Sequence, residues 1–153
     1  MSLPVPRAEF LVMVLIAAWL PAVAFAALGE PETGIEAERA ATGATHVVRR
    51  AALYTVHELT LQSGTTVREF ASLDGTVFAV SWSGPFLPDL RALLGSHFGA
   101  LTAANRTQPL NHSQLQLDEP AMVVHSEGRL RAFAGQAYLP GQLPAGVSVD
   151  ELH

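Results

Sequence analysis

Six histidines are the side chains best suited to chemistry in this sequence of 153 residues. They are His46, His57, His97, His112, His125 and His153. Metal ligands often recur at fixed short spacings, and no two of these histidines show one. The sequence contains no cysteine. It therefore predicts no metal site and no cofactor, although His57 and His125 both fall on predicted strands and could meet in space.

Ser83, Asp89 and His97 provide the residue types of a serine hydrolase, which needs a nucleophile, a base and an orienting acid. Ser83 lacks the leading glycine of the G-x-S-x-G motif, and no phosphate-binding glycine loop occurs. His97 falls at the edge of an apolar helical stripe, which favours a structural role. The sequence predicts no catalytic residue. A small periplasmic hydrolase or metal-dependent enzyme remains the alternative function.

The segment around a Gly-Pro break is the best candidate for a binding surface. Trp82 continues a bulky apolar strand face, which favours a place in the core. Beside the break it could instead line a groove. We predict a ligand or partner surface that includes the exposed side of the preceding hairpin and the residues Trp82, Ser83, Gly84, Pro85 and Asp89.

A hairpin must position these residues. Segment Thr66–Ser72 is rich in β-formers, and Asp74-Gly75 is a strong turn signal because both residues tolerate positive φ. Segment Thr76–Trp82 then alternates in the manner of a strand. Its bulky face is expected to point to the core through Phe78, Val80 and Trp82.

One helix should follow the hairpin. Pro85 ends the strand, Pro88 suits a helix start, and Asp89 complements the helix dipole. A core-facing stripe is formed by Leu90, Leu93, Leu94, His97 and Phe98. Gly95 and Gly99 are both candidate helix ends, and the stripe favours Gly99.

Further segments have strand-like patterns of different strength. They are Ala52–Leu61, Ala121–Ser126 and Arg129–Tyr138, with weaker patterns at His46–Arg50 and Asn111–Leu117. Glu127-Gly128 is expected to form a hairpin turn, and the Pro- and Gly-rich segment Leu139–Gly146 to wrap the surface. The pattern predicts an α+β fold: a mainly antiparallel sheet of about five strands with one principal helix packed on it.

The amino-terminal residues have the layout of a secretory signal peptide. An uninterrupted apolar run, Phe10–Leu20, is followed by Pro21 and an alanine-rich stretch. Cleavage is predicted near Ala26, with Ala27 as the alternative site and an uncleaved membrane anchor as the competing interpretation. The predicted domains are a signal peptide at 1–26, a flexible leader at 27–45 and a single α+β domain at 46–153.

The charge pattern excludes one large class of partner. The formal net charge is −5, and no basic run extends beyond Arg49-Arg50. Nucleic-acid binding needs a basic surface, so we expect none. Membrane contact is expected only through the signal segment before its cleavage.

Three blocks of sequence resemble a known family. They are Gly64–Phe70, then Gly75–Pro85 with Pro88–Leu90, then Ser126–Phe133 running on to Ala145–Val147. Over roughly Leu28 to Val149, the chain resembles a family of short exported proteobacterial proteins that carry a domain of unknown function. The resemblance implies an envelope protein, periplasmic or secreted, and supplies no activity or ligand. We expect a non-enzymatic binding or assembly module whose partner is an envelope protein or a small ligand.

Overall fold

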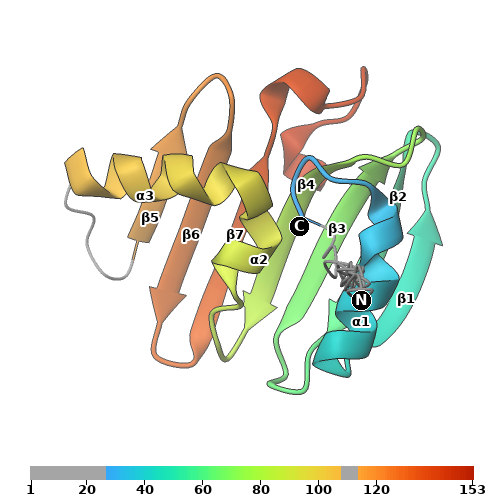
Figure 1. Ribbon diagram of the computed structural model, residues 1–153, viewed down its shortest axis with the longest axis horizontal. Helices are drawn as coiled ribbons and strands as arrows, with labels where there is room; N and C mark the ends of the chain where they lie inside the picture. Colours follow the sequence, from blue (N-terminus) through green and yellow to red (C-terminus); the bar gives the residue numbers. More distant parts are fainter. Residues whose placement is uncertain (1–26, 108–113) are drawn as a thin grey trace, which may run out of the picture.

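A computed structural model describes residues 27–107 and 114–153. Within them, one antiparallel sheet has the strand order β1-β2-β3-β4-β7-β6-β5 (Figure 1). Its strands are β1 (Thr45–Arg50), β2 (Tyr54–Thr60), β3 (Thr66–Ser72), β4 (Val77–Gly84), β5 (Gln114–Asp118), β6 (Val123–Arg129) and β7 (Ala132–Tyr138). The predicted α+β class is confirmed.

The prediction of about five strands is wrong, because the sheet formed by the described residues has seven. The two weakest sequence patterns belong to β1 and β5, which are the edge strands. Edge strands are half-paired and exposed, so their hydrophobic alternation is faint. All residues of β1 except His46 are exposed. The predicted segment Asn111–Leu117 lies partly outside the described residues.

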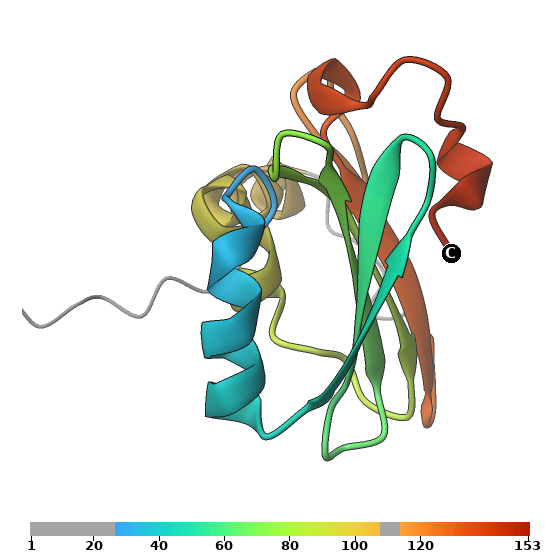
Figure 2. The same cartoon turned by 90° about the vertical axis from the view of Figure 1, so that its right-hand side faces the viewer.

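The helices cover one face of the sheet (Figure 2). They are α1 (Ile35–Thr42), α2 (Leu90–Leu94) and α3 (Phe98–Thr107), with short 3-10 turns η1 (Glu32–Gly34), η2 (Gly95–His97), η3 (Pro140–Gln142) and η4 (Val149–Glu151). From Leu143 onward, the carboxyl-terminal segment packs on the other face. In the described part of the chain, no helix has the length and apolarity needed to span a membrane.

The prediction of one principal helix ending at Gly99 is wrong. The α2 helix ends before Gly95, and α3 then runs through Gly99 to Thr107. Gly95 has φ +50°, and a Cβ there would lie 2.7 Å from the Cβ of Ala27. The break therefore allows the amino-terminal residues to approach the helical layer.

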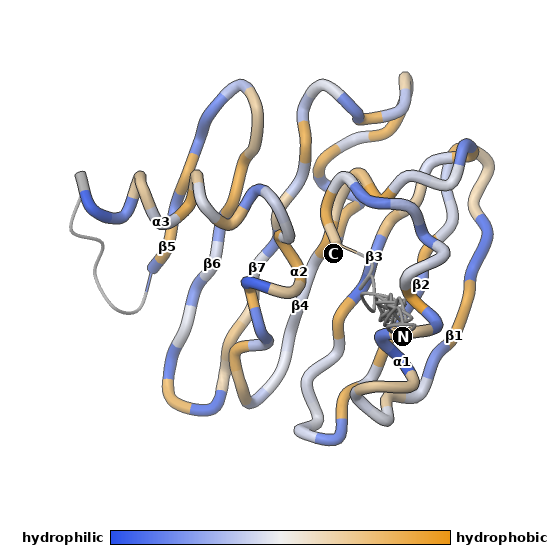
Figure 3. Tube along the Cα trace, viewed as in Figure 1, coloured by the Kyte–Doolittle hydropathy of each residue, from blue (hydrophilic) through white to orange (hydrophobic). Residues whose placement is uncertain are grey.

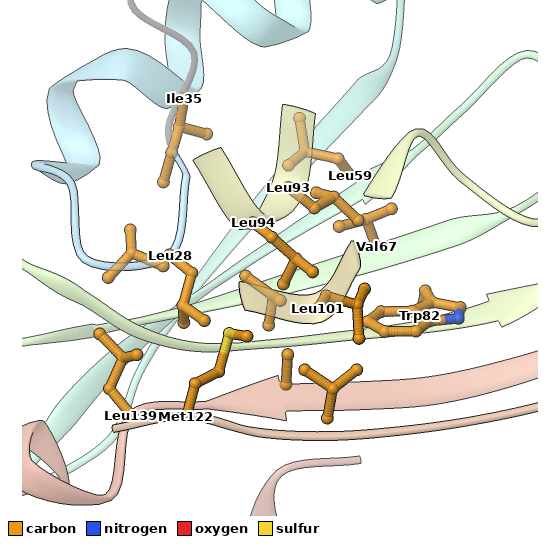
Figure 4. Packing of buried hydrophobic residues seen from close by; sticks show 14 of the residues in the cluster. Leu28, Ile35, Leu59, Val67, Trp82, Leu93, Leu94, Leu101, Met122 and Leu139 are labelled. Carbon is orange, nitrogen blue, oxygen red and sulfur yellow. The ribbon is translucent and has the colours of Figure 1, made fainter. Parts of the chain in front are cut away.

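A β-bulge overturns the predicted core face of β4. Strand β3 pairs Phe70 with Ala79 but Ala71 with Val77, so Phe78 is skipped. The extra residue shifts the alternation, and Phe78 points away from the face that holds Val80 and Trp82. Two cores result. The larger lies between the sheet and the helices (Figure 4), and the smaller surrounds Phe70 and Phe78 on the opposite face.

The residues predicted to form a flexible leader have defined structure. Leu28 and Ile35 are fully buried, and Leu28 N donates to Leu93 O at 2.9 Å. Glu32 to Thr42 forms η1 and α1. The structure thus differs from the expectation because a few well-spaced apolar residues suffice to anchor a polar segment. Residues 1–26, where the signal peptide is predicted, lie outside the described residues.

The predicted turn at Glu127-Gly128 is wrong, because both residues belong to β6. The turn lies at Leu130-Arg131, where Arg131 has φ +60°. Gly128 serves close packing instead, since a Cβ there would lie 2.7 Å from the Phe133 ring. The glycine was mistaken for a turn residue because both roles require a missing side chain.

The carboxyl-terminal segment covers part of the face opposite to the helices. Leu152 is fully buried and belongs to the smaller core with Phe70, Phe78 and Ala79. Leu143, Val147 and Val149 pack against the same cluster. The rest of this face, which we call the open face, stays uncovered by a second layer and carries the polar side chains described next.

Candidate functional site

One row of polar side chains crosses six neighbouring strands on the open face. Because Val80 and Trp82 point to the helices, the residue between them points to the open face. Strand register places each member directly opposite the next. From β2 to β5 the row is Glu58, Arg68, Ser81, Gln136, His125 and Gln116.

The middle of this row lines a groove. A cavity of about 420 Å³ lies against Arg68, Ser81, Gln136 and His125 and is bordered by His153. A second cavity of about 690 Å³ lies at the end of β4, β6 and β7. Glu127 and Ala134 line both cavities, so the two form a continuous depression, which we call the open-face groove.

Three residues that line the open-face groove have a buried polar atom without a hydrogen-bond partner among the described residues: Ser81, Gln136 and Trp82, the last through Nε1. Ser81 is 4% exposed, and its Oγ makes no hydrogen bond to any described residue. The same holds for Oε1 of Gln136, the residue directly opposite on β7. Buried polar atoms are nearly always satisfied, and leaving one unpaired costs about 1–3 kcal/mol. Both atoms are covered in the free protein, so a ligand would pair with Ser81 Oγ and Gln136 Oε1 only if these side chains turned toward the groove.

Ion pairs hold the groove's charged side chains. Arg68 Nε donates to Glu58 Oε2 at 2.8 Å, and Arg49 Nη2 lies 3.6 Å from Glu58 Oε1. On the far side, His125 Nε2 lies 2.6 Å from Asp118 Oδ1. The amide of Gln116 and then His125 lower the pKa of Asp118 below its usual range. The groove therefore lies between a guanidinium and an imidazole, both oriented by carboxylates.

The structure separates the predicted surface residues into two groups. Ser83 lines the first cavity and is exposed, and Gly84 with Pro85 lines the second. Trp82 is 3% exposed and belongs to the larger core, where its ring lies against Gly135, and it also lines the first cavity. Asp89 is the cap of α2, with its carboxylate accepting from Arg91 N at 2.9 Å and Ala92 N at 3.2 Å.

Sequence reasoning missed the polar row itself. The alternation of β4 placed Ser81 away from the core, but this signal identifies one member only. The others come from strands whose order, β4-β7-β6, does not follow the sequence. Pairing of β4 with β7 brings Ser81 against Gln136, and β6 then adds His125.

The residues of the alternative enzyme do not meet. Ser83 lies on the open face, whereas His97 lies in the helical layer, beside Gly29. His57 faces the helices with Leu59, and His125 faces the opposite side of the sheet. Among the described residues, no group of three or more histidine, aspartate or glutamate side chains could hold a metal ion. His112 lies outside them.

One family model matches the chain over residues 24–152, and its description is "Protein of unknown function (DUF2844)". The match covers the whole sheet, both cores and the open-face groove except His153. No curated protein and no solved structure matches the chain. The resemblance to a domain of unknown function is thereby confirmed, and the fold and its surfaces must supply the functional argument.

Proposed function

The chain belongs to the family described as "Protein of unknown function (DUF2844)", and from this premise we propose that it is a non-enzymatic binding module of the bacterial envelope. The open-face groove is its binding surface, and the occupant is an elongated polar ligand or a polar segment of an envelope protein. Export rests on the amino-terminal sequence pattern, with cleavage near Ala26 and a periplasmic or secreted mature protein.

The pair of unsatisfied atoms at the centre of the groove carries this proposal. Ser81 Oγ can donate and accept, whereas Gln136 Oε1 only accepts. A ligand with alternating donors and acceptors, such as a peptide backbone or a chain of hydroxyl groups, would satisfy both at once when the two side chains turn toward the groove. The binding free energy would then include relief of a desolvation cost already present in the free protein.

The ends of the groove set further requirements on the occupant. Arg68 lines the first cavity and donates through Nε to Glu58, so its terminal guanidinium nitrogens are candidate donors to an occupant. Arg129, Arg131 and Phe133 line the second cavity. A ligand that spans both cavities would therefore meet donors at each end and an aromatic ring at one. This arrangement suits an elongated molecule better than a compact one.

Site-specific photo-crosslinking in the native envelope tests the proposal. A photoreactive p-benzoylphenylalanine replaces Ser83 in the groove or, as matched control, Ala100 on the helical layer; both residues are exposed. We expect a specific adduct from position 83 and none from position 100. Its mass distinguishes a small ligand from a protein. Adducts from both positions, or from position 100 alone, would contradict a binding surface on the open face.

A further inference from the structure

Strand β1 leaves one edge of the sheet without a neighbouring strand. It is the first strand in the order β1-β2-β3-β4-β7-β6-β5, and α1 lies over the sheet without extending beyond this edge (Figure 1). Its six residues pair with β2 one for one, without a bulge, and none of them is proline. Bulges and prolines are common devices that prevent an exposed edge from pairing with another chain. The edge is therefore regular enough to accept a further strand.

Two hydrogen bonds fix the direction of the backbone groups along this edge. Ala51 N donates to Tyr54 O, and Leu61 N donates to Thr65 O, both at 2.9 Å. The first bond closes the β1–β2 hairpin, and the second directs the odd-numbered residues of β2 toward β3. Because bonded and non-bonded pairs alternate in an antiparallel ladder, both bonds direct the even-numbered residues of β2 toward β1. The odd-numbered residues of β1 are their partners, so the even-numbered ones turn their N–H and C=O groups outward.

The outward residues of β1 are His46, Val48 and Arg50. Their backbone N–H and C=O groups have no partner among the residues that the structure describes. Each of the three therefore offers one donor and one acceptor to a further strand.

The side chains of this edge are also suited to a contact. Val48 lies on the helical face and Val47 on the open face, and each is 48% exposed. Arg49 Nη2 lies 3.6 Å from Glu58 Oε1, so its charge is balanced within the chain. Arg50 forms no ion pair within the described part of the chain. The edge thus combines two exposed valines with one unpaired cation.

We propose that β1 pairs antiparallel with β1 of a second copy of this chain, about a two-fold axis beside Val48, so that the two sheets join at their edges. In this register Val48 faces Val48, and His46 faces Arg50, so every outward residue bonds to an outward residue of the other copy. Registers centred on Arg49 or Arg50 would place like charges directly opposite each other. Registers centred on His46 or Val47 would pair fewer of the outward groups.

Apolar contacts across the junction would cover both valines. On the helical face, Val48 of each copy packs against Val48 of the other. On the open face, Val47 lies opposite Arg49 of the second copy, whose methylene groups can cover the valine while its guanidinium stays in water. The junction therefore removes exposed apolar surface from both faces of the edge.

Charge complementarity favours a second copy as the occupant. Arg50 of the second copy would lie beside His46, whose Nδ1 is 3.1 Å from Glu36 Oε1. Glu36 also accepts from Arg39 Nε at 2.9 Å, but a carboxylate has about four lone-pair sites and can accept further bonds. The unpaired guanidinium of each copy is thereby brought toward a carboxylate of the other.

The symmetry of the junction also limits assembly to two copies. A head-to-tail junction of β1 with β5 would leave a free edge at each end and would continue without closing. Two β1 strands close on each other and leave the open-face groove, between β3 and β6, uncovered. The dimer therefore does not depend on the binding function proposed above.

Disulfide cross-linking tests both the partner and the register. The sequence contains no cysteine, so a single introduced cysteine forms a disulfide only between two chains. Opposite residues in a hydrogen-bonded pair have Cα atoms about 5.5 Å apart, which suits a disulfide. Val48→Cys should form a covalent dimer several-fold faster than Val47→Cys, whose partner position is Arg49. Leu73→Cys, which is 74% exposed in the β3–β4 turn, measures the rate of random collision.

Sedimentation equilibrium of the purified chain without cysteines tests the dimer itself. An interface of one strand from each copy is small, so the dimer should form at high concentration and dissociate on dilution. Val48→Pro removes an outward N–H without breaking a bond to β2, and it should lower the dimer fraction while the fold is retained. Arg50→Glu places a second carboxylate beside Glu36 and should also weaken the dimer. Arg106→Glu, an exposed position on α3, is the matched control and should leave the dimer fraction unchanged.

Three results would overturn the proposal. The first is a wild type that stays monomeric up to its highest soluble concentration. The second is cross-linking of Val47→Cys or Leu73→Cys as fast as that of Val48→Cys. The third is a disulfide that forms between Val48→Cys and Gln116→Cys of β5 faster than between two copies of Val48→Cys, because it would show head-to-tail pairing of the two edges.

Discussion

At the scale of single residues, Gly84 shows how close approach of two backbones fixes the groove. It has φ +157°, a backbone conformation that residues with a side chain rarely adopt. A Cβ at this position would also lie 2.5 Å from the Cα of Thr65. Thr65 is fully buried, and its hydroxyl donates to Phe86 O at 2.7 Å. The contact holds the loop after β4 against the start of β3.

Substitution of Gly84 should therefore destabilise the fold. Gly84→Ala is expected to lower the free energy of unfolding by about 1–3 kcal/mol, because the added methyl group forces the two backbones apart. Gly141→Ala is the control, since a Cβ there meets nothing within 4 Å. Chemical denaturation of both variants measures the difference. If Gly84→Ala were as stable as Gly141→Ala, the close approach of the backbones at Gly84 and Thr65 would not be needed for stability.

Glu69 gives a prediction with a defined sign in pH. Its pKa is raised in the folded state, so folding takes up protons above the ordinary glutamate pKa of 4.5. Stability should be highest near or below that value and should fall as pH rises. Glu69→Gln removes the ionisable group, so its melting temperature should exceed that of the wild type at pH 8 and approach it at pH 5. If the two melting temperatures differed by the same amount from pH 5 to pH 8, the raised pKa of Glu69 would be contradicted.

At the scale of elements, the loop and α2 are held together by Asp89. Its carboxylate caps the two backbone N–H groups at the helix start. Asp89→Ala should cost about 1 kcal/mol of stability, whereas Asp89→Asn keeps an accepting oxygen and should cost little. Thermal melts provide the comparison. If Asp89→Ala melted as the wild type but lost partner binding, Asp89 would belong to the binding surface as the sequence predicted.

Local chemistry made some elements predictable. The Asp74-Gly75 turn between β3 and β4 follows from two adjacent residues, and Gly75 indeed has φ +84°. The bulge at Phe78 was invisible because alternation shows no sign of an inserted residue until the partner strand is known. Glu69 is a charged residue within a strand, and such residues are rarely buried. Only the position of α1, which brings Glu38 over it, makes it a buried acid.

The candidate binding surface could likewise be located only in part from the sequence. The Gly-Pro break made one position predictable, the strand end at which Ser83, Gly84 and Pro85 lie. Arg68, Gln136 and His125 were not predictable, because their proximity depends on the order of strands from both halves of the chain. The contact between His46 and His57, whose ring nitrogens lie 3.1 Å apart, likewise requires the pairing of β1 with β2, and β1 has a weak pattern in the sequence.

At the scale of the whole molecule, the sheet separates two surfaces with different chemistry. The helical face holds the larger core and the buried carboxyl groups of Glu38 and Glu69. Along β3, hydrophilic residues interrupt the hydrophobic ones (Figure 3), and Arg68 and Glu69 point to opposite faces. The open face is partly covered by the carboxyl-terminal segment, which borders the groove. The groove thus depends on how that segment is anchored.

Leu152 is the anchor of the carboxyl-terminal segment. It is fully buried against the smaller core, so Leu152→Ala should cost about 2–5 kcal/mol and loosen the border of the groove. Leu130→Ala is the matched control, because Leu130 is 96% exposed and should contribute little. Denaturant unfolding of the two variants tests the anchor. If Leu152→Ala left the free energy of unfolding unchanged, the carboxyl-terminal segment would not unfold together with the rest of the domain.

Blocking the open-face groove tests the central claim most directly. Ser83→Trp places a large side chain in the groove, and Ala100→Trp places the same side chain on the helical layer; both positions are exposed. Tagged wild type and variants are purified from the native envelope, and co-purifying components are quantified by mass spectrometry. We predict that Ser83→Trp alone loses the specific component while all three proteins melt alike. Retention of that component by Ser83→Trp, or its loss from Ala100→Trp alone, would contradict binding in the groove.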